Sequence, residues 1–377
     1  MKRTTKLLAL LLAALLLAST FSAAYAVEIA GYVVSDYGDC GNGVKWYFGK
    51  AKNDPTAKED TMVIEGKGAM ADYSQVKAPQ WVKLKEKIAH VVVRDGVTSV
   101  GAYAFADCPF LRDVTLADTV RAIGDSAFQN CENLEKAKLP KSMTTIGKHA
   151  FHDCYDLQDI NIPEKLTSIG EYAFFQCISL ESAITIPGTV NTIPAFAFFK
   201  CFSIPTLEIK EGVRSIEIGA FTQCSSLKSI SLPSSLRFLG LSAFSDCTSL
   251  TEVTIPNGVT SIPTNAFAGC SSLKNLTLYK SVTFIDDGAF SGCPISKVTF
   301  YGTSEEWERV WVGEHNESLK NSEIFAFVKI EEKEKTEEKT CDYCGEVHDD
   351  SFMGKLTAFF HKILLFFKKA LSFLGVK

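Results

Sequence analysis

The amino-acid sequence predicts a repeat solenoid that is mainly β and has a parallel sheet along one face. Three observations predict it: nine cysteines at a near-constant interval, an Ala-Phe pair before each of them, and a short alternating strand pattern after most of them. A period in this range is typical of stacked repeat units. The length of 377 residues therefore need not mean several independent domains.

Cysteine and phenylalanine mark the repeat. Consecutive cysteines are 23 residues apart, with a single step of 24, and a phenylalanine stands three residues before each of them. A unit of this length cannot bury its own apolar side chains, so it gains stability by stacking on its neighbours. We therefore expect one continuous core. The cysteines are Cys108, Cys131, Cys154, Cys177, Cys201, Cys224, Cys247, Cys270 and Cys293, and the phenylalanines are Phe105, Phe128, Phe151, Phe174, Phe198, Phe221, Phe244, Phe267 and Phe290.

The residues after each cysteine alternate as in a short strand with one wet face. In one unit Leu227 and Ile230 point to one side and Ser231 to the other. A second apolar pair at spacing three follows, as in Val259 and Ile262. Each coil should thus have two extended edges joined by turns.

The nine repeat cysteines are predicted to be free thiols. A cysteine that fills the same place in every coil acts as a small buried hydrophobe. Neighbouring cysteines could approach disulfide distance, but their number is odd and pairing would break the equivalence of the coils.

The complete unit resembles a known family. Cys-x-x-Leu-x-x-Val/Ile-x-Ile/Leu-Pro followed by Val-x-x-Ile-Gly-x-x-Ala-Phe-x-x-Cys is similar to the BspA-type leucine-rich repeats of bacterial and protist surface proteins, over residues 88–300. The resemblance implies a horseshoe-like, right-handed leucine-rich-repeat solenoid. It also implies a non-catalytic adhesion role, in which the repeats bind an extracellular protein or cell-surface ligand of a host, a matrix or another cell. The alternative is a glycan- or cell-wall-binding component of the envelope.

Both ends of the solenoid should be capped. Residues 1–26 have a basic start, an apolar run and a small-residue ending, which predicts a signal peptide cleaved near Ala26 and hence a secreted, extracellular or cell-surface protein. Residues 27–87 predict a small β-rich N-terminal cap. Residues 301–330 predict a C-terminal cap with a helical turn at Ser304 to Trp307 and a closing strand at Ile324 to Val328.

The tail divides into three segments. Residues 331–340 form a charged linker, and residues 341–350 hold a Cys-x-x-Cys motif. Cys341, Cys344 and His348 are half of a usual zinc site, so zinc binding is one interpretation and a disulfide or free thiol pair is the other. Residues 351–377 predict a basic amphipathic helix that contacts a membrane surface, or docks on the protein's own cap or a partner.

Charge and motifs exclude several functions. Removal of the three basic residues of the signal segment changes the formal charge from −5 to −8, which argues against nucleic acid as a partner. The sequence contains no phosphate-binding glycine loop, paired carboxylates at a recognisable spacing or Ser-His-Asp order. We therefore expect no enzymatic activity and no cofactor, apart from the zinc interpretation of the tail.

One stretch of the repeats is unusually aromatic. Positions that are small or polar in most coils carry aromatic or apolar residues in the third to fifth coils, next to the step of 24 residues. Exposed apolar surface of this kind often marks an interaction site. The alternative is that a cap loop or the tail helix covers it. The predicted ligand-binding patch consists of Tyr155, Tyr172, Phe175, Ile178, Phe196, Phe199 and Phe202.

Overall fold

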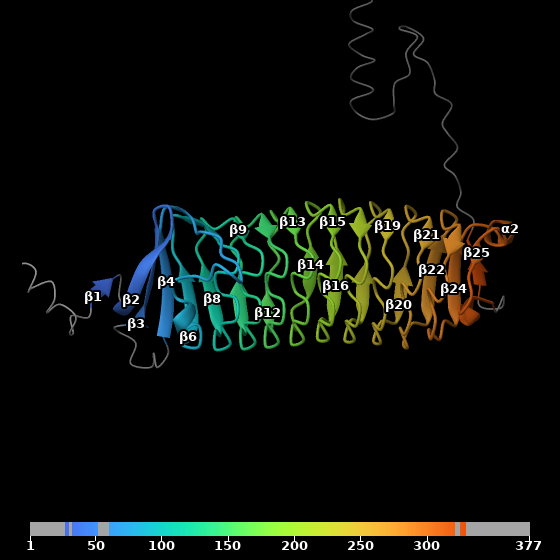
Figure 1. The fold of residues 1–377 in the computed structure, drawn as a ribbon. Coiled ribbons are helices and arrows are strands. Elements are labelled where there is room, and N and C mark those ends of the chain that lie inside the picture. Colours follow the sequence, from blue (N-terminus) through green and yellow to red (C-terminus); the bar gives the residue numbers. More distant parts are fainter. Residues whose placement is uncertain (1–26, 30–31, 52–59, 321–324, 329–377) are drawn as a thin grey trace, which may run out of the picture. The chain divides into compact units, whose positions relative to one another are not determined.

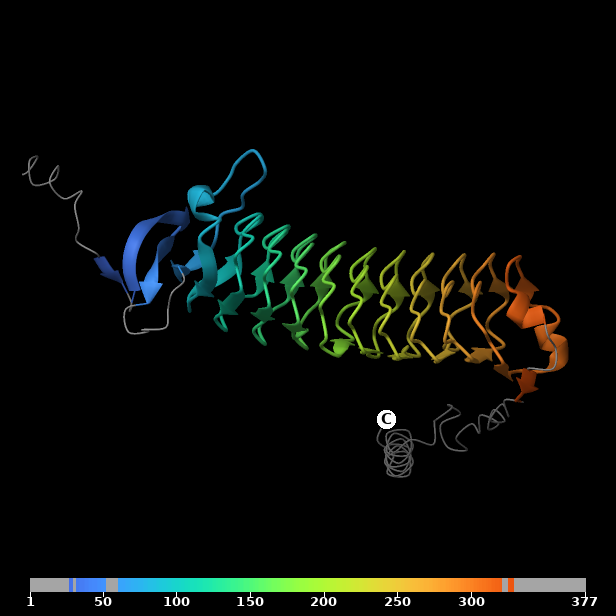
Figure 2. The same cartoon turned by 90° about the horizontal axis from the view of Figure 1, so that it is seen from below.

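The computed structural model describes residues 27–29, 32–51, 60–320 and 325–328. It confirms the predicted mainly β solenoid with parallel sheets (Figure 1). Coils stack in a row between a β-rich segment at one end and a short helical segment at the other, and Figure 2 shows the same row from below. We number the coils 1 to 9 by their repeat phenylalanine, from Phe105 to Phe290.

The N-terminal segment joins the solenoid without a break. Four strands form it, and the last of them pairs in parallel with the first strand of the repeats. A single turn of 3-10 helix follows before the repeats. The elements are β1 (Val27–Ile29), β2 (Tyr32–Gly41), β3 (Val44–Ala51), β4 (Asp60–Gly66), β5 (Gly68–Ala69) and η1 (Val82–Leu84).

Each coil contributes one strand to each of two parallel sheets, as the two apolar edges predict. The first sheet has β6 (Ile88–Val93), β8 (Asp113–Leu116), β10 (Lys136–Lys138), β12 (Asp159–Ile160), β14 (Ile184–Ile186), β16 (Thr206–Ile209), β18 (Ser229–Ser231), β20 (Glu252–Thr254), β22 (Asn275–Tyr279), β24 (Lys297–Tyr301) and β26 (Phe325–Phe327). The second has β5, β7 (Val97–Val100), β9 (Ala122–Ile123), β11 (Thr145–Ile146), β13 (Ser168–Ile169), β15 (Thr192–Ile193), β17 (Ser215–Ile216), β19 (Phe238–Leu239), β21 (Ser261–Ile262), β23 (Phe284–Ile285) and β25 (Trp311–Val312).

The hydrogen-bonded ladders of both sheets are interrupted twice. One interruption lies between β12 and β14 and between β13 and β15, where the repeat has its additional residue. The other lies between β18 and β20 and between β19 and β21, with no change in repeat length.

The core contains two buried ladders, one of rings and one of thiols. The nine repeat phenylalanines stack with centroids 4.9 to 5.5 Å apart, and we call them the phenylalanine ladder. From coil 2 onward each thiol donates to the carbonyl of the preceding coil's phenylalanine, at 3.1 to 3.4 Å. All ten described cysteines are buried and unpaired, and the packing argument predicts this for the nine of the repeats.

A tryptophan closes the N-terminal end of the core. Inside the solenoid, the N–H of each repeat phenylalanine donates to an alanine carbonyl of the next coil, as Phe105 does to Ala127 at 2.8 Å. Coil 1 has no such coil before it. The indole N–H of Trp81 donates to the free carbonyl of Ala104 at 3.0 Å, and its ring packs on Phe105. Trp81 thus satisfies a backbone group that the first coil would leave unpaired.

An asparagine closes the C-terminal end by the converse contact. The side-chain oxygen of fully buried Asn316 accepts the N–H of Phe290 at 2.9 Å, in place of the alanine carbonyl of a further coil. Its amide donates to the carbonyls of Asp286 and Gly313. The side chain thus satisfies backbone groups that a terminal coil would leave unpaired.

The remaining C-terminal elements agree in part with those expected from the sequence. Helix α2 (Ser304–Trp307) lies where a helical turn is expected, with Thr303 and Glu306 forming its capping box. Helix η2 (Glu317–Lys320) follows, and β26 provides the predicted closing strand by pairing with β24. Trp311 is not a buried cap, because it is 48% exposed and stacks on Phe284.

The predicted signal peptide, charged linker, Cys-x-x-Cys segment and amphipathic helix lie outside the described residues. Within the part of the chain that the structure describes, no helix has the length and apolar character needed to cross a membrane.

Candidate binding surface on the turns of the coils

The third side of each coil is the turn that carries the Ala-Phe pair and the cysteine. Two residues of every turn have a positive φ, one just before the alanine and one just before the cysteine. The alanine and phenylalanine between them point inward and are buried, whereas the neighbouring side chains point outward. We call the outward side of these turns the turn face.

Six stacked rings in two columns occupy the turn face of coils 3 to 5. In the first column, Tyr172 stacks on His149 at 4.8 Å and on Phe196 at 5.1 Å between ring centroids. In the second, Phe175 stacks on His152 at 4.6 Å and on Phe199 at 4.8 Å. We call these six residues the ring ridge.

The two columns also touch each other in every coil of the ridge. The centroids are 5.2 Å apart in coil 3, 5.6 Å in coil 4 and 5.8 Å in coil 5. All six side chains are partly exposed. The ridge is therefore one contiguous aromatic surface.

Four residues of the predicted patch lie in the ridge, namely Tyr172, Phe175, Phe196 and Phe199. The other three, Tyr155, Ile178 and Phe202, occupy the position after the cysteine in the same coils, and Phe202 is 37% exposed. Among the described residues, no ring contact connects Tyr155 or Phe202 to the ridge. The structure thus divides the predicted patch into a ring cluster and an adjacent row.

Sequence reasoning missed the two histidines of the ridge. His149 has the repeat position of Tyr172, and His152 has that of Phe175. The sequence contained this signal, since aligning coil 3 with coils 4 and 5 places planar rings at both positions.

The first column is held in a strained backbone conformation. The φ angles of His149, Tyr172 and Phe196 are 53°, 57° and 55°. A bulky residue in this left-handed region costs about 1–2 kcal/mol relative to its usual conformation. Five other coils have smaller residues there, of which glycine and asparagine adopt this conformation most easily: Ser126, Gly219, Ser242, Asn265 and Gly288. The rings are therefore not what this backbone position favours.

Stacking leaves mainly ring edges at the surface. Within each column the rings lie face to face, with interplanar angles between 7° and 21°. At the end of the first column, the ring of Phe196 covers Gly219 so closely that a Cβ there would collide with it. At the end of the second, the Lys200 ammonium lies 5.5 Å from the Phe199 centroid. Ring edges carry partial positive charge, which attracts carbonyl and carboxylate oxygens and the faces of other rings.

The ridge is uncharged at neutral pH. Burial, and then His152, lowers the pKa of His149. Burial also lowers the pKa of His152, and Asp153 opposes this decrease. The Nδ1 atom of His152 lies 3.1 Å from a carboxylate oxygen of Asp153, and burial outweighs the effect of this negative charge. Both imidazoles are therefore neutral above their ordinary pKa of 6.5.

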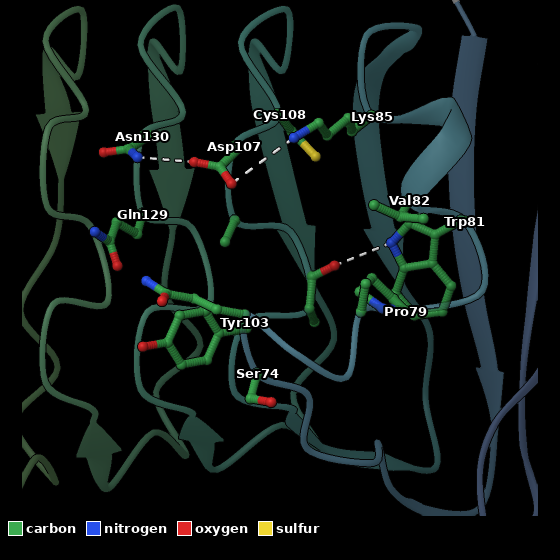
Figure 3. Close-up of a pocket in the computed structure, with 14 residues that line it drawn as sticks. Ser74, Pro79, Trp81, Val82, Lys85, Tyr103, Asp107, Cys108, Gln129 and Asn130 are labelled. Carbon is green, nitrogen blue, oxygen red and sulfur yellow. Dashed lines mark hydrogen bonds and ion pairs between the residues drawn. The ribbon is translucent and has the colours of Figure 1, made fainter.

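A pocket of about 210 Å³ opens on the turn face of coils 1 and 2. Figure 3 shows Trp81, Pro79 and Val82 on one side of it and Tyr103 and Gln129 on the other. The segment before the repeats, which includes η1, supplies the first side, and the turns of the two coils supply the second. We call this space the N-terminal pocket.

A loose ion pair lies at one end of the N-terminal pocket. The ammonium of Lys85 is 3.8 Å from one carboxylate oxygen of Asp107, and the amide of Asn130 donates to the other at 2.8 Å. Cys108 also lines the pocket, where burial raises the pKa of its thiol to about 12. A thiol with this pKa stays protonated at neutral pH and is a poor nucleophile.

The structure adds nothing to the zinc interpretation. Cys341, Cys344 and His348 lie outside the described residues. Across residues 27–29, 32–51, 60–320 and 325–328, no group of three or more His, Cys, Asp or Glu side chains is placed to hold a metal ion.

Residues 83–205 and 191–310 match the family model described as the BspA type leucine-rich repeat region, in six copies. The crystal structure of a leucine-rich repeat protein from Bacteroides ovatus is similar, with 21% identity over 82% of this chain and 79% of that one and a TM-score of 0.53. A leucine-rich repeat protein from Eubacterium ventriosum is also similar, with 23% identity over 71% of this chain and 86% of that one and a TM-score of 0.40.

A leucine rich cell surface protein from Faecalibacterium prausnitzii is also similar, with 22% identity over 77% of this chain and 98% of that one and a TM-score of 0.36. The comparison with curated proteins gave no significant match. The Bacteroides structure agrees with the solenoid fold described above. Because the repeat model covers more than half of the sequence, this chain belongs to the BspA-type leucine-rich repeat family.

Proposed function

We propose that the protein is secreted or held at the cell surface and mediates protein–protein interaction or adhesion through the ring ridge. One observation carries the proposal: outward-facing rings occur in contact in three successive coils, at positions where most other coils have small or polar residues. The predicted signal peptide supports the location. Membership of the repeat family supports an interaction role.

The ridge has the properties of a binding surface rather than of a core. Aromatic residues are frequent anchors at protein interfaces, because they bury a large area with few rotatable bonds. A contiguous apolar surface that the fold does not need is expected to have a partner. Strained backbone positions cluster at active and binding sites, and three of the six ridge residues hold such a position.

The geometry favours a protein partner over a glycan. A sugar ring stacks on the open face of an aromatic ring, but the faces in the ridge are used within the columns. The outward edges suit backbone carbonyls, carboxylates and aromatic side chains. Host proteins, matrix proteins and proteins of other cells are all sources of such groups.

The predicted roles of the tail belong to the same proposal. We propose that residues 351–377 contact the membrane surface and so retain the protein at the cell. Deletion of residues 341–377 should then release it into the medium, whereas unchanged cell association would contradict this. Metal analysis of the mature chain with and without Cys341 and Cys344 tests the zinc interpretation separately.

The function is tested with an array that carries both extracellular proteins and glycans. We expect the mature chain to bind protein probes, and the Tyr172→Ser/Phe175→Ser variant to lose binding by about tenfold or more. These serines should be tolerated, because Ser126 and Ser245 hold the same positions in coils 2 and 7.

The matched control is Phe284→Ser/Trp311→Ser, which removes an exposed stacked pair from β23 and β25. This control should bind as the unchanged chain does. Retention on glycan probes alone, with competition by free sugar, would contradict the proposal. Full binding by the Tyr172→Ser/Phe175→Ser variant would do so as well.

A further inference from the structure

The N-terminal pocket and the ring ridge lie on the same face of the solenoid. Both are built from the outward positions of the turns. Gln129, which lines the pocket, holds in coil 2 the repeat position that His152 holds in coil 3. The backbone N–H of Asn130, another pocket residue, donates to the carbonyl of His152 at 2.8 Å. The pocket thus borders the ridge along the turn face.

The pocket and the ridge both have planar rings at the positive-φ position before the alanine. Nine residues hold the positive-φ position before the alanine, and four of them have planar rings. Three of these four form the first column of the ridge, and the fourth, Tyr103, lines the pocket with a φ of 54°. Among the nine repeat turns, strained ring positions before the alanine therefore occur in the pocket and the ridge alone.

The pocket has the shape and polarity of a socket for one aromatic side chain with a polar tip. Trp81, Pro79 and Val82 provide an apolar wall, and Lys85 and Asp107 lie at one end (Figure 3). Their separation of 3.8 Å leaves donor and acceptor capacity for a hydroxyl group. Tyrosine and tryptophan suit such sites, where one end is apolar and the other is polar.

The spacing along the face fits a short stretch of extended chain. The pocket lies between coils 1 and 2, and the centre of the ridge is coil 4. At roughly 4.8 Å per coil their centres are about 12 Å apart, which an extended peptide at about 3.3 Å per residue spans with about four residues.

We propose that the pocket and the ridge bind one extended segment of a partner protein, with a hydroxyl-bearing aromatic anchor in the pocket and apolar residues about four positions away over the ridge. This rests on the proposed function and deepens it, because it names the form of the partner. Backbone carbonyls of the extended segment would face the ring edges between the two anchors.

A phage-displayed library of random peptides tests the inference on the mature chain. We expect enriched sequences with a tyrosine or tryptophan about four residues from an apolar pair. Ala106→Phe fills the pocket and should reduce binding of these peptides by about tenfold or more. The change should be tolerated by the fold, because Phe175 and Phe199 occupy the same position in coils 4 and 5.

The matched control is Ala268→Phe, which makes the same change at the same repeat position in coil 8, away from the pocket. It should leave binding unchanged. If Ala106→Phe binds the peptides fully while Tyr172→Ser/Phe175→Ser loses them, the inference is overturned and the proposed function stands. If no peptide is enriched while protein probes still bind the ridge, the inference of an extended segment is also overturned. If neither variant changes binding, both proposals fail.

Discussion

The phenylalanine ladder and the ring ridge are two sets of stacked rings in the same turns, one on each side of the backbone. Phe174 belongs to the ladder and is fully buried, whereas its neighbour Phe175 belongs to the ridge and is partly exposed. The ladder occurs in all nine coils, and the ridge in three. Uniform positions of a repeat are those that every coil needs for stacking. Positions that change in a few adjacent coils are free to serve recognition.

The cysteines on the buried side of the turns should not react with thiol reagents in the folded protein, and this is the largest effect that we expect. Burial raises the pKa of Cys108 from 9.0 to about 12, which lowers the thiolate fraction at neutral pH by about 1,000-fold. We expect the ten described cysteines to react with a thiol reagent only after denaturation. Quantitative titration without reductant should then find at least these ten thiols. A count of only a few would show that the cysteines are paired.

Truncation of one ladder ring should destabilise the solenoid strongly. Phe174→Ala removes a fully buried ring that stacks on Phe151 and Phe198, and large-to-small changes of this kind cost about 3–5 kcal/mol. Urea denaturation followed by circular dichroism measures the loss. Phe238→Ala is the control, because that ring is 56% exposed and should cost far less. Equal losses from the two changes would contradict the assignment of the ladder to the core.

Loss of the C-terminal cap should have an intermediate effect. Asn316→Ala leaves the N–H of Phe290 and three backbone carbonyls without the partner that Asn316 provides, which costs about 1–3 kcal/mol. The exposed Asn257→Ala is the control and should change stability by less than about 0.5 kcal/mol. Thermal unfolding of both variants checks this. An unchanged Asn316→Ala variant would mean that the end of the solenoid needs no cap.

Sequence reasoning predicts the ladder well because its physical cause is periodic. A residue that recurs every 23 positions must stack on its equivalents, so the solenoid, its two strands per coil and its buried cysteines follow without coordinates. A large ring outside the repeats suits a cap, and Trp81 has this role, whereas Trp311 is exposed. The role of Asn316 was not predictable, because it depends on hydrogen-bond geometry at one position.

The candidate binding surface could be predicted only in part. Four of its ring residues stand out because they replace small or polar residues, but His149 and His152 look like ordinary polar turn residues until the coils are aligned. The N-terminal pocket depends on residues 74–85 folding against coils 1 and 2, and that segment has no periodic pattern. Positive φ angles are also invisible in the sequence, except where glycine recurs.

The two histidines of the ridge should make stability depend weakly on pH. Because the pKa values of His149 and His152 are lowered in the folded state, the unfolded chain takes up protons first as the pH falls. Their contribution is therefore present above about pH 6.5 and decreases as the pH falls below that value. His149→Ser/His152→Ser should flatten the profile between pH 7 and pH 5, as measured by urea midpoints at each pH. An identical slope in the variant would show that other groups cause the dependence.

The smallest expected change in stability tests the central claim, that the ridge serves recognition and the ladder serves the fold. The measurement is the free energy of unfolding of Tyr172→Ser/Phe175→Ser. Both rings are partly exposed, and serine already holds these two positions in coils 2 and 7, so the change opens no cavity in the core. The account predicts a loss of less than about 2 kcal/mol for the two rings together. A loss of about 3 kcal/mol or more, as expected for a ladder ring, would contradict it.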